Sequence, residues 1–94
     1  MPILRIEHPV PDFDMWKRVF DEDPAQREKS GVRRYALSRP VDDANYIAVD
    51  LEFDTREEAE AFLARLRELW AGPGGRVSSE QQARILESVE TRDY

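Results

Sequence analysis

Few residues in this chain could carry out chemistry. His8 is the single histidine, and its side chain is the only one whose ordinary pKa lies near neutrality, so it is the main candidate for a general base. A general base needs a cavity beside it and an orienting partner, whereas a structural histidine needs only backbone carbonyls or a nearby acid such as Asp12. No partner stands at a recognisable spacing, so the residues by themselves favour a structural role. His8 is nevertheless the leading candidate for a site residue.

Composition excludes several other kinds of site. The 94 residues include no cysteine, which rules out disulfides, a thiolate nucleophile and cysteine-ligated zinc. His8, Asp12 and Asp14 lack a second histidine, so we expect no metal there. The AGPGG run at 71–75 follows a predicted helix and lacks the Lys-Ser/Thr pair of a phosphate-binding loop. A formal net charge of -6 argues against nucleic acid or an anionic membrane surface as a partner.

The elements that must position these residues are clearest between residues 46 and 70. Residues 46–53 alternate apolar and more polar side chains with a period of two, which is typical of a half-buried strand. Residues 55–70 begin with a Thr55-x-x-Glu58 capping box and carry one apolar stripe at helical spacing, so we predict a helix that packs on this strand. The stripe consists of Ala59, Phe62, Leu63, Leu66, Leu69 and Trp70.

The N-terminal third predicts a strand followed by a broken helix. Residues 2–8 alternate, with His8 on the same face as the apolar side chains, and two prolines end the strand. Asp12 is a good N-cap for a helix that runs to about residue 21, and we expect Asp23 and Pro24 to start a second helical piece. Three aromatic side chains share one face of the first helix, where packing is a simpler role than lining a ligand site. They are Phe13, Trp16 and Phe20.

The remaining segments complete a recognisable order of elements. Residues 32–39 predict a second strand, 40–45 a hairpin loop rich in turn-forming residues, and 83–90 a last strand with weak alternation. The order is β-α-β-β-α-β within one domain that spans residues 1–94. It predicts the α+β ferredoxin-like arrangement, a four-stranded antiparallel sheet with both helices on one face.

Several short motifs stand in a fixed order between residues 3 and 66. They are a strand that ends in His8, Val10-Pro11-Asp12-Phe13 followed by Trp16, Phe20-Asp21-Glu22, Gly31-Val32, Asp42 to Asn45, and Ala59 to Phe62. In this order they resemble the small bacterial proteins of the dimeric α+β barrel superfamily, relatives of the antibiotic-biosynthesis monooxygenases that include cyclase-like members. The superfamily hosts monooxygenases, isomerases, haem-handling enzymes and proteins of no known activity, so the resemblance concerns fold more than chemistry.

The resemblance also implies site residues. Cofactor-free monooxygenases of the superfamily are associated with an Asn, a Trp and a His; His8 and Trp16 supply two of these, while Asn45 falls in the predicted hairpin turn. We expect a small organic ligand, aromatic ligands included, with His8 as the catalytic candidate and Trp16, Tyr35 and Asp50 as ligand contacts. We expect no cofactor, and His8 is the only residue that could serve as the axial ligand of a haem.

A homodimer through the sheet is the partner that the resemblance implies. If the apolar residues of the strands face the helices, the opposite face carries charged and polar side chains that must pair when two such faces meet. These include Arg5, Glu7, Tyr46, Asp50 and Glu52, with Arg34 and Ser38 from the second strand and Arg84 or Glu87 from the last. A non-catalytic ligand-binding or assembly domain is the alternative to an enzyme. No segment reads as a signal peptide or membrane span, so we expect a cytoplasmic location.

Overall fold

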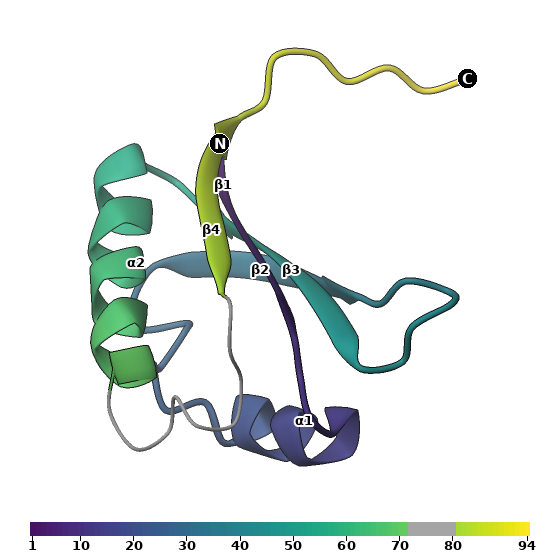
Figure 1. The fold of residues 1–94 in the computed structure, drawn as a ribbon. Helices are drawn as coiled ribbons and strands as arrows, with labels where there is room; N and C mark the ends of the chain where they lie inside the picture. The colour runs from purple at the N-terminus through teal and green to yellow at the C-terminus, as the bar shows by residue number, and fades with distance from the viewer. Residues whose placement is uncertain (72–80) are drawn as a thin grey trace.

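The computed structural model describes residues 1–71 and 81–94, which form six elements around one sheet (Figure 1). The four strands lie in the order β2-β3-β1-β4, and each neighbouring pair is antiparallel. The predicted β-α-β-β-α-β order and the ferredoxin-like α+β architecture are therefore confirmed. The elements are β1 Pro2–Pro9, α1 Phe13–Glu22, β2 Val32–Ser38, β3 Tyr46–Phe53, α2 Arg56–Ala71 and β4 Gln82–Glu87.

The inner face of the sheet forms the core, as the alternation predicts. On β3 every second side chain is buried, and β1 places its own buried side chains beside them through the register His8↔Ile47, Ile6↔Val49 and Leu4↔Leu51. Helix α2 covers this face with Ala59, Phe62 and Leu63. The strand residues of the core are Leu4, Ile6, Val32, Ile47, Val49, Leu51 and Phe53.

Both predicted helix starts are confirmed by hydrogen bonds to free backbone amides. Asp12 is the N-cap of α1, and its carboxylate accepts from the N–H groups of Asp14 and Met15. Thr55 and Glu58 form the reciprocal capping box at the start of α2, with both bonds at 3.2 Å. Such caps fix where a helix begins, because the first four amides of a helix have no intrahelical acceptor.

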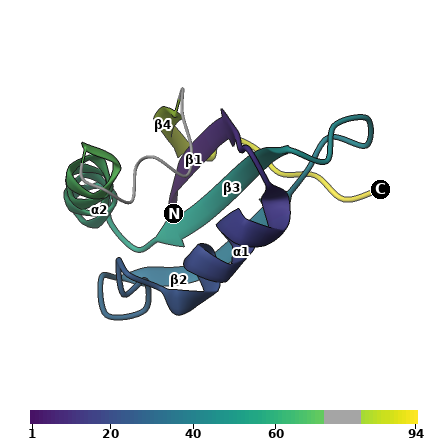
Figure 2. The same ribbon diagram turned by 60° about the horizontal axis from the view of Figure 1, so that its bottom comes forward.

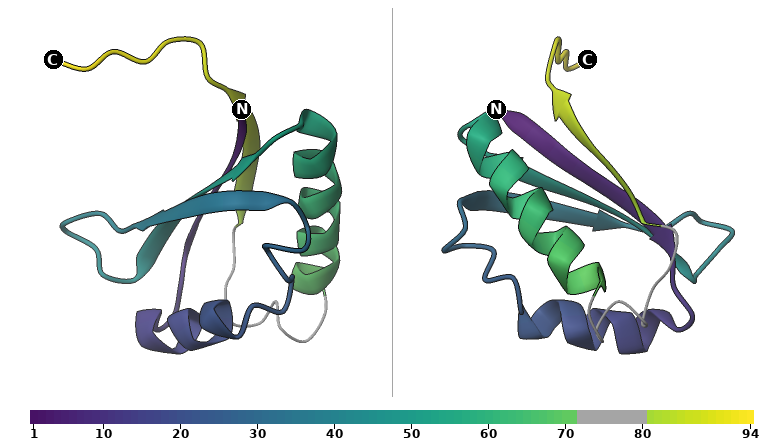
Figure 3. Two further views of the ribbon diagram at one scale, coloured as in Figure 1. Left: turned by 180° about the vertical axis from the view of Figure 1, so that it is seen from behind. Right: turned by 60° about the vertical axis from the view of Figure 1, so that its left-hand side comes forward.

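The two helices cover the same face of the sheet in different ways (Figures 2 and 3). Helix α2 runs alongside the strands, whereas α1 crosses beyond the end of β1. No side chain of α1 is fully buried, although its aromatic residues pack against the core. None of the helices in the described part of the chain is long and apolar enough to cross a membrane.

The prediction of a second helical piece after Asp23 is wrong. Helix α1 ends at Glu22, and Asp23 is its C-cap in the left-handed conformation, with φ 55°. Gln26 also has a positive φ, 52°, so residues 24–31 form turns instead of a helix. Asp23 still caps a backbone amide, since its Oδ1 accepts from the N–H of Arg27 at 2.9 Å. Asp tolerates this conformation better than most residues, which is why the chain can turn here.

One strand boundary differs from the sequence expectation, and one strand contains an irregularity. The last strand ends at Glu87, and Val89 is exposed in the C-terminal tail. Strand β2 contains a register shift between Val32 and Arg34, so Val32 and Tyr35, three residues apart, both stand opposite inward-facing residues of β3. An extra residue in one strand has this effect, because it displaces the alternation by one position.

Candidate functional site

A cavity of about 360 Å³ lies between the inner face of the sheet and the two helices. Its volume falls within the roughly 300 to 1,000 Å³ that is usual for small-molecule sites. Most of the wall is aliphatic or aromatic. Among the described residues it is lined by Ile6, His8, Trp16, Val19, Phe20, Pro24, Ala25, Arg27, Ile47, Val49, Leu51, Phe62, Leu66, Glu68, Leu69 and Trp70.

His8 lies in the wall of this cavity because it occupies an inward position of β1. Its side chain is only 2% exposed, and Nδ1 lies 3.0 Å from the carbonyl oxygen of Pro9. A carbonyl oxygen can only accept, so Nδ1 carries the proton and Nε2 presents a lone pair. Burial lowers the pKa of His8, and the bond to the Pro9 carbonyl offsets this only in part. The imidazole is therefore neutral at pH 7.

The second ring nitrogen of His8, Nε2, is not used in a hydrogen bond to the described residues. No described residue hydrogen-bonds to Nε2, yet no fully covered side-chain nitrogen or oxygen in the described part of the chain lacks a partner. Nε2 therefore keeps at least a small accessible area, and the cavity is the space that His8 lines. A neutral imidazole with an accessible lone pair can accept a proton or a hydrogen bond from a ligand.

Trp16 stands beside His8 and belongs to a series of aromatic contacts. Its ring meets the imidazole edge-on at a centroid distance of 6.1 Å and stacks on Phe20 at 4.9 Å. Trp16 and Phe20 line the cavity and also pack on the core. They therefore combine core packing with lining a ligand site, the two roles that the sequence left open. Trp70, at the end of α2, lines the same cavity. Flat aromatic walls suit a planar ligand.

Two expected ligand contacts lie outside the cavity. Tyr35 faces the inner side of the sheet and its ring contacts Phe20 at 5.1 Å, but it is 43% exposed and does not line the cavity. Asp50 lies on the outer face, where it receives two hydrogen bonds from Arg5 at 2.8 and 2.9 Å. Alternation along β3 explains this, because Asp50 lies between two inward residues, Val49 and Leu51.

Sequence reasoning missed Arg27, which lines the cavity from the turn between α1 and β2. Its guanidinium lies over the ring of Phe20, 3.9 Å from the centroid, and Nη1 donates to the Phe20 carbonyl oxygen at 2.9 Å. The side chain is 16% exposed. A residue in an irregular turn leaves no periodic signal, so the only hint was its place four residues after Asp23. Among the described residues of the wall, Glu68 of α2 is the acidic one.

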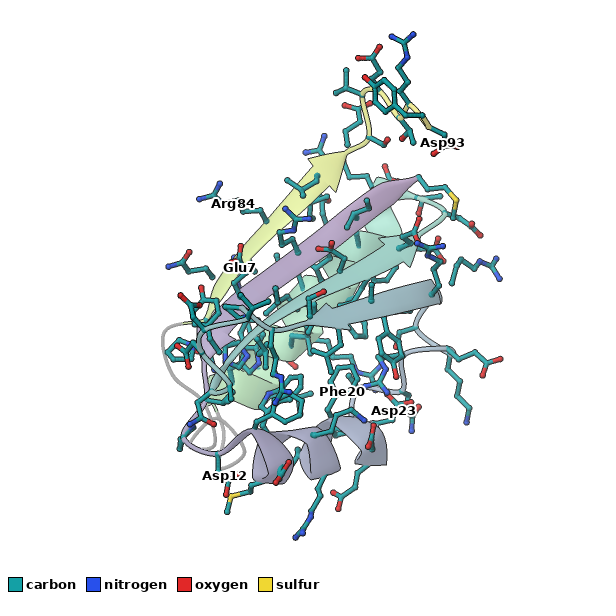
Figure 4. The ribbon with its side chains drawn as sticks, turned by 90° about the vertical axis from the view of Figure 1, so that its right-hand side faces the viewer. Glu7, Asp12, Phe20, Asp23, Arg84 and Asp93 are labelled. Atoms are coloured by element: carbon teal, nitrogen blue, oxygen red, sulfur yellow. The ribbon has the colours of Figure 1, made fainter. Side chains whose placement is uncertain are left out.

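The outer face of the sheet carries balanced charges (Figure 4). Arg5 pairs with Asp50, and Arg34 forms an ion pair with Glu52 across β2 and β3. By the strand register three arginines and three carboxylates face outward, so this face is neutral although the chain carries -6 overall. They are Arg5, Arg34, Arg84, Glu7, Asp50 and Glu52.

Asn45 has a structural place. Its side-chain oxygen accepts from the N–H of Phe13 at 3.3 Å, and its carbonyl accepts from the N–H of Val10 at 2.8 Å. The hairpin residue thus holds the start of α1 and lies outside the cavity wall. Within the described residues no cluster of three His, Cys, Asp or Glu side chains could hold a metal ion.

Comparisons with solved structures show that the fold is shared with ferredoxin-like proteins and with proteins described as antibiotic biosynthesis monooxygenases. SnoaB, a cofactor-independent oxygenase from Streptomyces nogalater, matches with a TM-score of 0.77 at 17% identity, covering 96% of this chain and 94% of that one. A dimeric ferredoxin-like protein from an uncultured marine organism matches at 0.69 and 9%, and MhuD, with two manganese protoporphyrin IX bound per active site, at 0.67 and 20%. Both cover 100% of each chain. No family model and no curated protein matches the sequence.

Proposed function

We propose that this protein is a monooxygenase-like enzyme that acts on a small aromatic molecule in the cavity, with His8 as general base. The observation that carries the proposal is the neutral imidazole in an apolar wall, with Nδ1 committed to the Pro9 carbonyl and Nε2 accessible. The likeness to SnoaB, a cofactor-independent oxygenase, supports the class of reaction. We also propose a cytoplasmic location, which fits the absence of cysteine.

The base would act on an acidic O–H or C–H group of the bound molecule. Transfer of that proton to Nε2 gives an electron-rich anion and a protonated imidazole, which keeps its hydrogen bond to the Pro9 carbonyl. Dioxygen is the oxidant. When a ring CH₂ becomes a carbonyl, one oxygen atom enters the product, the other leaves as water, and the substrate supplies all four electrons. No cofactor is needed for that balance, and the chain contributes positioning and proton transfer.

We further propose that two copies associate through the outer faces of their sheets. This face carries no net charge and holds two internal ion pairs, which supports association, because a face with a large net charge would repel its own copy. A single domain of this size also buries a smaller share of its surface than a larger domain does, so a second copy would add to stability. A neighbour of the same fold that is described as a dimeric ferredoxin-like protein supports a dimer.

The proposal is tested by separating binding from turnover. Trp16 and Trp70 both line the cavity, so their fluorescence should change when a planar aromatic ligand with an acidic ring CH₂ group binds. Oxygen consumption is then followed with an oxygen electrode. His8→Gln removes the base and keeps a polar side chain, so it should retain binding and lose oxygen uptake by about 10² to 10⁴-fold. Val41→Ala, in the exposed hairpin, is the control.

The outcomes separate this proposal from its alternatives. Unchanged oxygen uptake in His8→Gln would remove His8 as the base. Binding without any oxygen uptake would favour a non-catalytic ligand-binding domain, a reading supported by the lack of a described acidic partner for His8. Haem added to the protein should give no shifted absorption band that depends on His8. Such a band would instead assign the histidine to an iron, as its single axial candidate.

A further inference from the structure

We infer that Arg27 is the residue that selects ligands with an anionic oxygen, a carboxylate or phenolate on an aromatic ring. This rests on the proposed function in one respect, since it assigns a substrate class to the same cavity. Within the described part of the chain Arg27 is the only cationic side chain in the cavity wall. The described lining is otherwise apolar or neutral apart from Glu68, so among the described residues one arginine dominates how the cavity distinguishes charged ligands.

The guanidinium of Arg27 is held in place by three neighbours. Nη1 donates to the Phe20 carbonyl oxygen at 2.9 Å and lies 3.5 Å from Oδ1 of Asp23. The plane lies over the Phe20 ring at 3.9 Å and is 5.0 Å from the centroid of Tyr35. Phe20 and Asp23 stand together at the end of α1 (Figure 4). A positioned arginine loses less freedom when a ligand binds than a flexible one.

Two of the three guanidinium nitrogens of Arg27 are left for a ligand. The hydrogen bond of its side chain to a described residue is donated by Nη1, and no described residue accepts a hydrogen bond from Nε or Nη2. No fully covered side-chain nitrogen in the described residues lacks a partner, so these groups are accessible. Nε and Nη2 together present the two parallel donors that match a carboxylate.

Arg27 differs from the other ion-paired arginines among the described residues. Arg33 and Arg56 each direct Nε at a carboxylate at 2.8 Å, and Arg5 commits both Nε and Nη2 to Asp50. These forks are already occupied by acids of the same chain. Arg27 lies beside its acid at a longer distance and through one nitrogen, which leaves its charge available to the cavity.

The test compares two probes that differ in charge and share a shape, 2-naphthoate and 2-naphthamide, by fluorescence titration at pH 7. The native protein should bind the carboxylate about tenfold or more tightly than the amide, because a hydrogen bond between charged groups is stronger than a neutral one. Arg27→Met should abolish this preference and leave the amide affinity within about threefold. Arg27→Lys keeps the charge but not the fork, so it should retain only part of the preference.

Arg65→Met is the matched control, because this exposed arginine of α2 hydrogen-bonds to Ser30 and does not line the cavity. It should keep the full preference. A preference that persists in Arg27→Met, or equal binding of both probes by the native protein, would overturn the assignment while the cavity remained a ligand site. Failure of both probes to bind would instead count against the proposed function. Urea unfolding of each variant shows whether lost binding reflects lost structure.

Discussion

The pairing of Arg5 with Asp50 gives a quantitative test of the proposed dimer. In the single chain these side chains are 46% and 33% exposed, and two hydrogen bonds join them on the outer face. A pair this exposed contributes only about 0.2 to 1 kcal/mol, since water and salt screen it. If a second sheet covers the face, Asp50→Asn leaves a buried and unpaired Arg5, which costs about 3 to 5 kcal/mol.

The two situations therefore predict different magnitudes for one substitution. A two-fold dimer contains the pair twice, so even the lower figure amounts to about 6 kcal/mol per dimer, roughly a ten-thousand-fold weaker association. We expect Asp50→Asn to convert the dimer to monomers at micromolar concentration. Asp21→Asn breaks the exposed Lys17–Asp21 pair of α1 and is the control, with a cost of about 0.3 to 0.5 kcal/mol.

Sedimentation and light scattering at several concentrations measure the effect. The native protein should have twice the 11.0 kDa chain mass, and Asp50→Asn should approach the chain mass. The double variant Arg5→Asp with Asp50→Arg restores an opposite-charge pair across β1 and β3 and should recover part of the association. A native protein of 11.0 kDa, or a dimer indifferent to Asp50→Asn, would refute the reasoning that this face is buried.

The remaining predictions concern the core and the cavity. Phe62→Ala should lower the free energy of unfolding by about 3 to 5 kcal/mol, because Phe62 is buried and packs on Phe53. Leu66→Ala should lower it by less, because Leu66 is only partly buried. Urea denaturation of the two variants measures both changes. Stability should fall as pH drops below about 6.5, the unfolded pKa of His8, because the folded pKa is lower and the unfolded chain takes up the proton first. His8→Gln should remove that slope; an unchanged slope would contradict the burial argument. Trp16→Phe should reduce the fluorescence response to an aromatic ligand, whereas retention of the full response would assign it to Trp70.

The sequence predicted the parts of the fold that depend on local rules. Alternation in residues 46–53 placed the buried face of β3 correctly, and the Thr55 and Glu58 box placed the start of α2. The same alternation places Asp50 on the outer face, so the prediction of Asp50 as a ligand contact disagreed with the alternation of the strand. The turn after α1 was mispredicted because Asp23 and Pro24 suit a helix start as well as a helix end, and only the left-handed backbone decides between them.

The candidate site was harder to predict because it depends on contacts between distant segments. His8 was found by its residue type, but the cavity beside it is formed by residues of β1, β3, α1 and α2 that lie far apart in the sequence. Arg27 was missed, since its position over Phe20 results from the turn that the sequence mispredicted. The role of Asn45 was equally hidden, because it links a hairpin to a helix start 32 positions away.

The way in which α1 is held explains how the domain keeps a cavity. The helix has no fully buried side chain, and polar contacts fix its two ends: Asp12 and Asn45 at the first turn, Asp23 and Arg27 at the last. Between these ends the aromatic face meets the cavity as well as the core. A helix fixed mainly by apolar burial would settle onto the sheet and close this space. Here hydrogen bonds at both ends of α1 help to hold the helix in place, so its aromatic side chains remain available to a ligand. Arg27 both binds the end of the helix and lines the cavity.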